Sequence, residues 1–226
     1  DRQTLLVIVV HGFNSSPARF APLVSGLRSN DILCAAYSYR DDQPILESAE
    51  QLATDLKRLA SDDPQRPIAL ITHSMGGLVA RAVIEQPDLV PGNVRKLIMI
   101  APPSQGSLLA HFAFGVDILD QISDHILSNE ATRFYALIED GLSEARHDLK
   151  PRSPLLRKLN TLSRNPDVRY SIFLGTGGHL KQRQLDLLQQ KIQTTAQQST
   201  AVGLFEPLVT QTLADLDEVV KGKGDG

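Results

Sequence analysis

One serine in the sequence has neighbours that suit a catalytic nucleophile. Ser74 lies in the segment Ile71–Gly77, after an aliphatic run and before a helical pattern that begins at Leu78. A tight turn from strand to helix raises a serine hydroxyl clear of the sheet, and it requires small residues two positions away on either side. Gly76 meets this requirement, whereas Thr72 stands where glycine is usual. The pattern predicts a nucleophile, and the alternative is an ordinary helix N-cap.

A serine that attacks a carbonyl also needs two hydrogen-bond donors for the oxyanion that forms. The Met75 N–H is one candidate, because it lies at the start of the helix, where the dipole favours negative charge. The Phe13 N–H is the other, because it follows the first aliphatic run and Gly12 lets the backbone approach a substrate closely. The alternative for this second segment is a simple turn. His11 and His73 are predicted to be structural: His11 can tie down the loop, and adjacent side chains on a tight turn diverge.

The elements around these residues are expected to alternate between strands and helices. Short aliphatic runs predict buried strands, and apolar residues at helical spacing predict helices, two of them after a Ser-Pro pair. Strands are expected at residues 5–10, 32–39, 67–72, 94–101 and 168–174, and helices at 16–29, 45–59, 78–85 and 153–159. This alternation indicates an α/β fold with a mostly parallel sheet flanked by helices, and with ligand sites at the carboxyl ends of the strands.

A long insertion, at about residues 108–165, interrupts the alternation. We expect it to form a helical cap or lid within a single domain of residues 1–226. Phe112, Phe114 and Ile118 are expected to line an acyl pocket there, the alternative being ordinary core packing. Such a lid favours a lipidic ester as the substrate and allows peripheral contact with lipid.

Composition limits the remaining possibilities. The chain has 226 residues, of which 42% are hydrophobic, and its net charge of -3 gives no sign of nucleic-acid binding. Cys34 is the one cysteine, so no internal disulfide can form, and it is expected to be buried and inert. No His/Cys cluster has zinc spacing, and the glycines at 175–178 fail the dinucleotide pattern because position 180 is Leu180. We therefore expect no metal or cofactor, while the compartment and the oligomeric state stay open.

Three segments of the chain resemble α/β-hydrolase lipases. They are Val9–Ser16, Thr72–Arg81 and Ile100–Ser107, and the likeness extends over about residues 4–178. It is closest to bacterial triacylglycerol lipases and to GPI inositol-deacylase-like esterases. The resemblance implies an α/β-hydrolase fold that lacks its last strand and helix here. It also implies a serine hydrolase that cleaves carboxylic esters through a Ser-His-Asp triad and an acyl-enzyme.

The resemblance also implies where the rest of the triad lies. The family has the order serine, acid, histidine, with the acid often in an Asp-Gly pair, so Asp225 before Gly226 is the expected acid. The alternative is a flexible tail. The family's histidine follows one more strand and is expected beyond residue 226, and His179 is a weaker candidate because it stands where the family has an acid. Two other functions stay open: a non-catalytic module that binds a partner or lipid, and an acyltransferase with the same triad.

Overall fold

The computed structural model describes residues 4–13, 15–106 and 144–174. Contacts along the chain divide it into two units, residues 1–106 with 147–174 and residues 107–146 with 175–226. The structure thus places residues 147–165, the last part of the expected insertion, in the first unit. The expected lid residues Phe112, Phe114 and Ile118, together with His179 and Asp225, lie outside the described residues.

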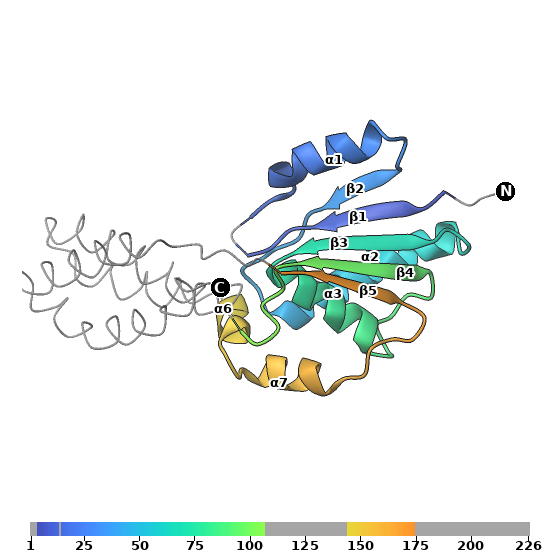
Figure 1. Ribbon diagram of the computed structural model, residues 1–226. Coiled ribbons are helices and arrows are strands. Elements are labelled where there is room, and N and C mark those ends of the chain that lie inside the picture. Colours follow the sequence, from blue (N-terminus) through green and yellow to red (C-terminus); the bar gives the residue numbers. More distant parts are fainter. Residues whose placement is uncertain (1–3, 14, 107–143, 175–226) are drawn as a thin grey trace, which may run out of the picture. The chain divides into compact units, whose positions relative to one another are not determined.

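The first unit is built on a five-stranded sheet in which every neighbouring pair of strands is parallel (Figure 1). The strands are β1 (Leu6–Val10), β2 (Cys34–Tyr37), β3 (Ile68–His73), β4 (Val94–Ile100) and β5 (Arg169–Phe173). Their spatial order is β2-β1-β3-β4-β5, so β3 is central and its carboxyl end lies in the middle of the sheet edge. The strands expected from the aliphatic runs are confirmed within a few residues, and so is the α/β class.

Helices follow the strands in the expected alternation. They are α1 (Ala21–Arg28) after the short 3-10 helix η1 (Pro17–Phe20), α2 (Ile45–Asp62), α3 (Met75–Glu85), α6 (Glu144–Leu149) and α7 (Pro154–Thr161). Among these described helices, none combines the length and the apolar composition that crossing a membrane requires.

The two faces of the sheet are covered by different helices. Val24 of α1 packs with Val9, Cys34 and Ala69 in a buried core. Because side chains alternate along a strand, Thr72 lies on the opposite face from Ala69, and Gly77 of α3 packs close to the Thr72 hydroxyl. Thus α1 covers one face and α3 the other, and α2 packs against α3 (Figure 1). Cys34 is buried, as the sequence predicts.

The expected helix at residues 16–29 is not one continuous α-helix. A 3-10 helix from Pro17 precedes α1, and the Ser16 side chain makes no capping hydrogen bond. Pro22 explains the break, because an α-helix begun at Pro17 would need the N–H that Pro22 lacks. In α1 itself Pro22 lies in the first turn, where no such bond is required. The second expected cap is confirmed, since the Ser153 hydroxyl accepts a hydrogen bond of 3.1 Å from the Leu156 N–H.

Candidate active site

Ser74 forms the whole connection between the central strand and its helix. β3 ends at His73 and α3 begins at Met75. The backbone of Ser74 has φ 51° and ψ -128°, in the left-handed half of conformational space that residues with a Cβ rarely adopt. Ser74 is half-buried, and its side chain makes no capping hydrogen bond to α3. A sharp turn of this kind places the side chain at the carboxyl edge of the sheet without committing its hydroxyl to the helix.

The backbone of Ser74 is itself fully engaged. Its N–H donates to the Ile100 carbonyl at 2.9 Å, which continues the ladder between β3 and β4. Its carbonyl accepts a bond of 2.8 Å from the Gly77 N–H. Since the Ser74 amide is used inside the sheet, donors for an oxyanion have to come from other residues.

The loop after β1 lies directly against this turn. A Cβ placed on Gly12 would lie 2.9 Å from the Ser74 Cβ, closer than real Cβ atoms approach. A Cβ on Gly76 would meet the His11 carbonyl oxygen and would lie 2.9 Å from the Val10 carbonyl oxygen. Neither position has room for a side chain, so both glycines are required by the close approach of two backbone segments.

The two predicted oxyanion donors belong to the residues that follow Gly12 and Ser74 along the chain. Phe13 follows Gly12 in the loop, and Met75 follows Ser74 at the first position of α3. The first amides of a helix have no partner within the helix, and the helix dipole favours negative charge at that end. The Met75 side chain is fully buried, which fixes this end of α3 in the core.

Thr72 occupies the position where glycine is usual in such a turn. Its hydroxyl is buried and donates to the Ile98 carbonyl at 3.3 Å. A Cβ on Gly77 would lie 3.4 Å from this hydroxyl and 3.0 Å from the Pro102 side chain. Gly77 therefore leaves the space into which the larger Thr72 side chain fits.

The two histidines near Ser74 have different surroundings. His11 is buried, its ring stacks on Tyr39 with centroids 4.4 Å apart, and its Nδ1 lies 2.9 Å from the Gly12 carbonyl oxygen. His73 is exposed, and its ring lies 5.9 Å from that of Phe20. His11 is thus packed in the core beside the loop, and the structural role of both histidines stays a prediction.

Two side chains that the sequence did not single out hold the loop after β1. The Tyr39 hydroxyl donates to the His11 carbonyl at 2.8 Å, and Asp41 accepts a bond of 3.0 Å from the Ser15 N–H. Burial raises the pKa of Tyr39 well above its usual range, and the nearby Asp41 charge raises it further. These residues follow β2 and lie more than 25 positions from their partners, so no local pattern marks them.

A polar network ties α3 to α7 and to the loop after β4. Arg81 pairs with Glu85 at 3.0 Å, and the Glu85 side chain is only 1% exposed. Arg81 also donates to Asn160 and to the Leu159 carbonyl, each at 3.0 Å. Asn160 in turn donates to the Ser104 carbonyl at 2.8 Å. The loop at the carboxyl end of β4 is thereby fastened beside α3.

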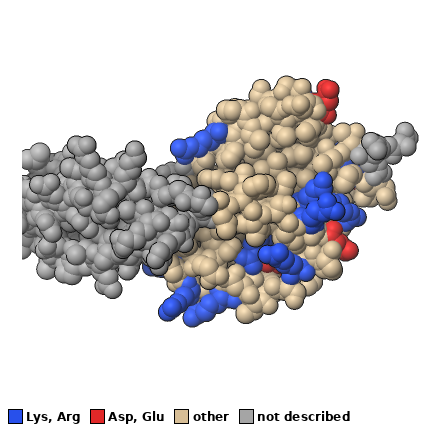
Figure 2. Space-filling model, viewed as in Figure 1, with Lys and Arg blue, Asp and Glu red and all other residues tan. Residues whose placement is uncertain are grey.

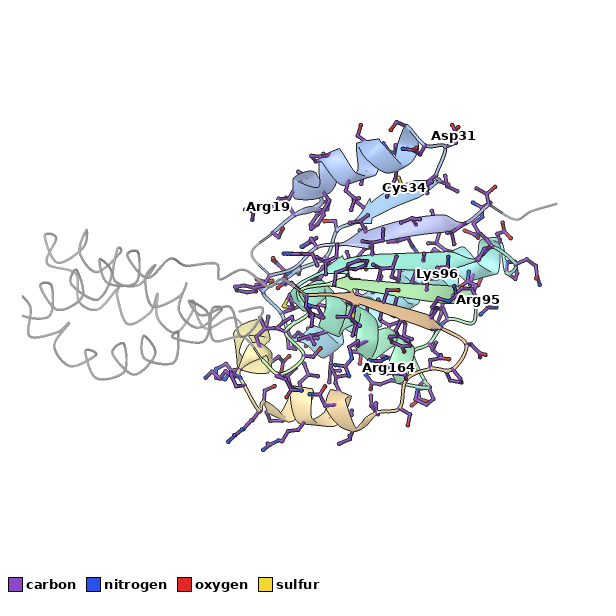
Figure 3. All side chains as sticks on the ribbon, viewed as in Figure 1. Arg19, Asp31, Cys34, Arg95, Lys96 and Arg164 are labelled. Atoms are coloured by element: carbon purple, nitrogen blue, oxygen red, sulfur yellow. The ribbon has the colours of Figure 1, made fainter. Side chains whose placement is uncertain are left out.

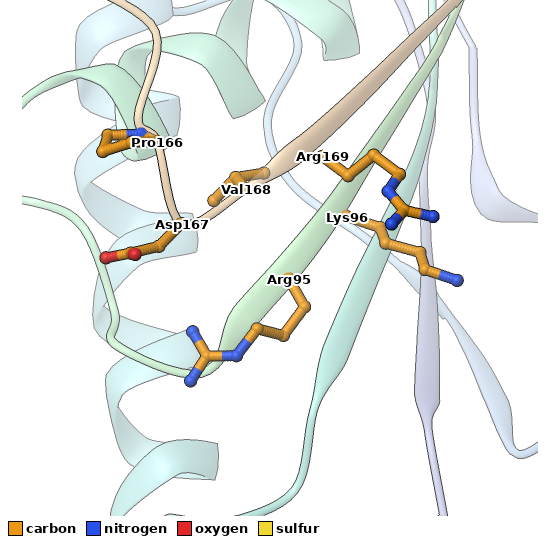
Figure 4. Close-up of a pocket in the computed structure, with 6 residues that line it drawn as sticks. All are labelled: Arg95, Lys96, Pro166, Asp167, Val168 and Arg169. Atoms are coloured by element: carbon orange, nitrogen blue, oxygen red, sulfur yellow. The ribbon is translucent and has the colours of Figure 1, made fainter.

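A shallow hollow lies at the opposite edge of the sheet. It has a volume of about 700 Å³ and is lined by Arg95, Lys96, Pro166, Asp167, Val168 and Arg169 (Figure 4). Basic side chains gather on this face of the molecule, with Arg95, Lys96 and Arg164 labelled in the same view (Figures 2 and 3). The hollow is at the amino ends of β4 and β5, whereas Ser74 follows the carboxyl end of parallel β3. It is therefore separate from the candidate site.

Part of the expected site falls outside the described residues. Asp225 and the expected acyl-pocket residues Phe112, Phe114 and Ile118 belong to this part. Within the described ranges, no group of three or more His, Cys, Asp or Glu side chains is placed to hold a metal ion. The described site thus consists of the Ser74 turn and the loop that packs on it.

Sequence comparisons find two similarities to known proteins. Residues 40–150 match the family model of the PGAP1-like alpha/beta domain. A GPI inositol-deacylase of Debaryomyces hansenii is 31% identical over 80 residues, which are 33% of this chain. The match covers 8% of that protein, so this chain corresponds to a small part of the relative's length.

Solved structures of lipases share the fold. The mature lipase BlEst2 of Bacillus licheniformis is 18% identical with a TM-score of 0.56, over 78% of this chain and 68% of that one. The phospholipase PlaB of Legionella pneumophila is 18% identical with a TM-score of 0.52, over 78% and 40%. Lipase 1 of Pelosinus fermentans is 14% identical with a TM-score of 0.51, over 74% and 66%. The chain therefore has the α/β-hydrolase fold, and the resemblance to lipases and inositol deacylases is confirmed.

Proposed function

We propose that this α/β-hydrolase chain is a serine hydrolase that cleaves carboxylic esters, with Ser74 as its nucleophile. The observation that carries the proposal is the backbone of Ser74, whose φ is 51° at the junction of β3 and α3. A backbone conformation of this kind costs on the order of 1–3 kcal/mol and persists where the surrounding structure holds it, which is common at active sites. The similar lipases, the phospholipase and the inositol deacylase support the same class of reaction.

The proposed reaction is acyl transfer in two steps. The Ser74 hydroxyl oxygen attacks the ester carbonyl carbon while a histidine takes its proton. The N–H groups of Phe13 and Met75 hold the oxyanion of the tetrahedral intermediate. The alcohol leaves with the proton from the histidine, and water then attacks the acyl-enzyme and releases the acid. By the family resemblance, Asp225 is proposed to orient this histidine. The same resemblance gives the expected position of the histidine, beyond residue 226.

The proposed substrate is a lipid-type ester. This proposal follows the similar proteins, which include a lipase, a phospholipase and a GPI inositol-deacylase. Phe112, Phe114 and Ile118 are proposed to line the acyl pocket, and the segment that carries them is proposed to contact lipid peripherally. No cofactor takes part in the proposed reaction.

Ester turnover by the full-length natural protein tests this function. We expect hydrolysis of p-nitrophenyl esters, with Ser74→Ala lowering kcat by on the order of 10⁶-fold, as loss of a triad serine does elsewhere. Ser61→Ala is the matched control, because Ser61 is exposed on α2 and bonds only to the Lys57 carbonyl in the described structure. Equal turnover by Ser74→Ala and the wild type would contradict the assignment.

The same assay separates the two alternative functions. An acyltransferase would convert part of the substrate into a new ester when glycerol is added, whereas a hydrolase releases mainly the free acid. A binding module would retain lipid esters without turning them over. We expect the free acid as the main product with and without glycerol.

A further inference from the structure

We propose that Tyr39 is a positioning residue that fixes the loop of residues 11–13 against the Ser74 turn. This inference rests on the proposed function, since it concerns the loop that carries the Phe13 oxyanion donor. It assigns a role to a side chain that no motif in the sequence marks.

Tyr39 holds His11 through two separate contacts. Its hydroxyl donates to the His11 carbonyl at 2.8 Å, and its ring stacks on the His11 imidazole with centroids 4.4 Å apart and planes 25° apart. Tyr39 is 8% exposed and His11 2% exposed, so the bond is shielded from water. Shielding from water strengthens a hydrogen bond and makes an unsatisfied carbonyl costly.

The carbonyl that Tyr39 holds is also the one that faces α3. A Cβ on Gly76 would meet the His11 carbonyl oxygen, so this oxygen lies between the Tyr39 hydroxyl and the first turn of α3. The carbonyl belongs to the peptide that joins His11 to Gly12, and Gly12 in turn lies against Ser74. Fixing this peptide plane fixes the path of the chain into Phe13.

The position of this chain segment matters for catalysis. An oxyanion donor acts at about 2.7–3.1 Å from the developing charge. A displacement of about 1 Å at such a site can cost on the order of 10²-fold in rate. Gly12 has no side chain to resist rotation of the peptide, so contacts from other residues have to restrain it.

Tyr39 can donate this bond at any pH at which an esterase is normally studied. Burial raises the pKa of Tyr39 above its usual range, and the charge of Asp41 and the nearby Tyr37 raise it further. The hydroxyl therefore stays protonated and neutral in alkaline as well as neutral buffer.

Tyr37, the last residue of β2, provides a matched control two positions before Tyr39. Its ring stacks on that of Tyr39 with centroids 6.0 Å apart and planes 18° apart, so the two tyrosines share one aromatic cluster. The Tyr37 hydroxyl, however, donates to the Asp55 carboxylate at 3.0 Å and not to the loop. Removing either hydroxyl removes one hydrogen bond of a tyrosine, but only one of the two bonds holds the His11 carbonyl.

The test compares Tyr39→Phe with Tyr37→Phe in the full-length protein. We expect Tyr39→Phe to lower kcat by about tenfold with KM nearly unchanged, less than the 10²–10³ lost with an oxyanion donor itself. A trifluoromethyl ketone, which forms an oxyanion on the serine, should bind about tenfold more weakly to Tyr39→Phe than to the wild type. Tyr37→Phe should keep the wild-type kcat and inhibitor affinity. Amide hydrogen exchange at residues 11–13 should become faster in Tyr39→Phe only.

The readouts separate failure of this inference from failure of the proposed function. Equal kcat and inhibitor affinity in Tyr39→Phe and the wild type would overturn the positioning role, and so would equal losses in both variants. If the wild type itself turns over no ester, the proposed function is contradicted instead. In that case unchanged hydrogen exchange at residues 11–13 in Tyr39→Phe would still overturn the inference, and faster exchange would support the restraint.

Discussion

Two glycines determine how closely the loop after β1 approaches the Ser74 turn. A Cβ at position 12 would have no room beside Ser74, and a Cβ at position 76 would have none beside the His11 carbonyl. The elbow pattern alone predicts that Gly76 is small, because the motif requires it. It does not predict which atoms occupy the space, since the loop comes from a distant part of the chain.

Gly76→Ala is expected to lower both stability and activity. The added methyl meets the His11 and Val10 carbonyl oxygens, so α3 and the loop must separate. Overpacking of this kind typically costs about 1–3 kcal/mol of unfolding free energy. Urea unfolding and ester turnover measure the two effects.

Gly26→Ala is the control for this substitution. Gly26 lies in α1, and a Cβ there meets nothing within 4 Å. Alanine in an exposed helix is favoured over glycine by roughly 0.5–1 kcal/mol, so this variant should be slightly more stable and fully active. Wild-type stability and turnover in Gly76→Ala would show that the close approach is unimportant.

At the scale of elements, Arg81 of α3 holds α7, and its ion pair with Glu85 of the same helix fixes the Arg81 side chain. Both side chains are largely shielded, and Arg81 also reaches Asn160 and the Leu159 carbonyl of α7. Because α3 carries the Met75 amide at its first position, its placement affects the candidate site. This pair is therefore expected to contribute more to stability than the exposed ion pairs on the surface.

Glu85→Gln is expected to lower the unfolding free energy by about 3 kcal/mol, because it leaves a shielded guanidinium without its anion. Asp63→Asn is the comparison, since Asp63 and Arg66 form an ion pair of similar length but are each about 40% exposed. Its loss should cost at most about 0.5 kcal/mol. Chemical unfolding of both variants provides the measurement, and equal costs would contradict the structural role of the Arg81–Glu85 pair.

The strands and most helices could be predicted because their signals are local. Aliphatic runs gave the five strands, and Ser153 before Pro154 marked the start of α7. The break before α1 was not predicted, although its cause, the missing N–H of Pro22, is visible in the sequence.

The contacts that organise the site could not be read from the sequence, because they join distant positions. Tyr39 and the His11 carbonyl are 28 residues apart. The Asp148 side chain accepts a bond from the Ile45 N–H, 103 residues away, at the start of α2. A tyrosine or an aspartate in a polar stretch has many possible partners, and only the folded chain selects one.

At the scale of the whole molecule, the two edges of the sheet differ in character. The carboxyl edge carries the Ser74 turn with its two glycine contacts, and the amino edge carries the basic hollow of Arg95, Lys96 and Arg169. Lys96 and Arg169 are register partners on neighbouring strands. Like charges in such positions repel each other, so this pair does not stabilise the amino edge of the sheet.

The proposed triad combines residues from distant parts of the chain, and Asp225 is its proposed acid. We expect Asp225→Asn to lower kcat by about 10⁴-fold with little change in KM, because the histidine then adopts the wrong tautomer. Asp217→Asn, a second aspartate in the same stretch of sequence, serves as the control and should stay active. Steady-state kinetics distinguish these outcomes, and near-normal turnover by Asp225→Asn would remove this residue from the triad.

The central claim is that the Ser74 hydroxyl is an activated nucleophile, and covalent labelling tests it most directly. A fluorophosphonate forms a bond between phosphorus and a nucleophilic serine oxygen and releases fluoride. Peptide mass spectrometry of the labelled full-length protein should find the phosphonate on Ser74, and Ser74→Ala should take up none, while Ser61→Ala is labelled like the wild type. Undiminished labelling of Ser74→Ala, or a wild-type protein that takes up no label at Ser74, would contradict the claim.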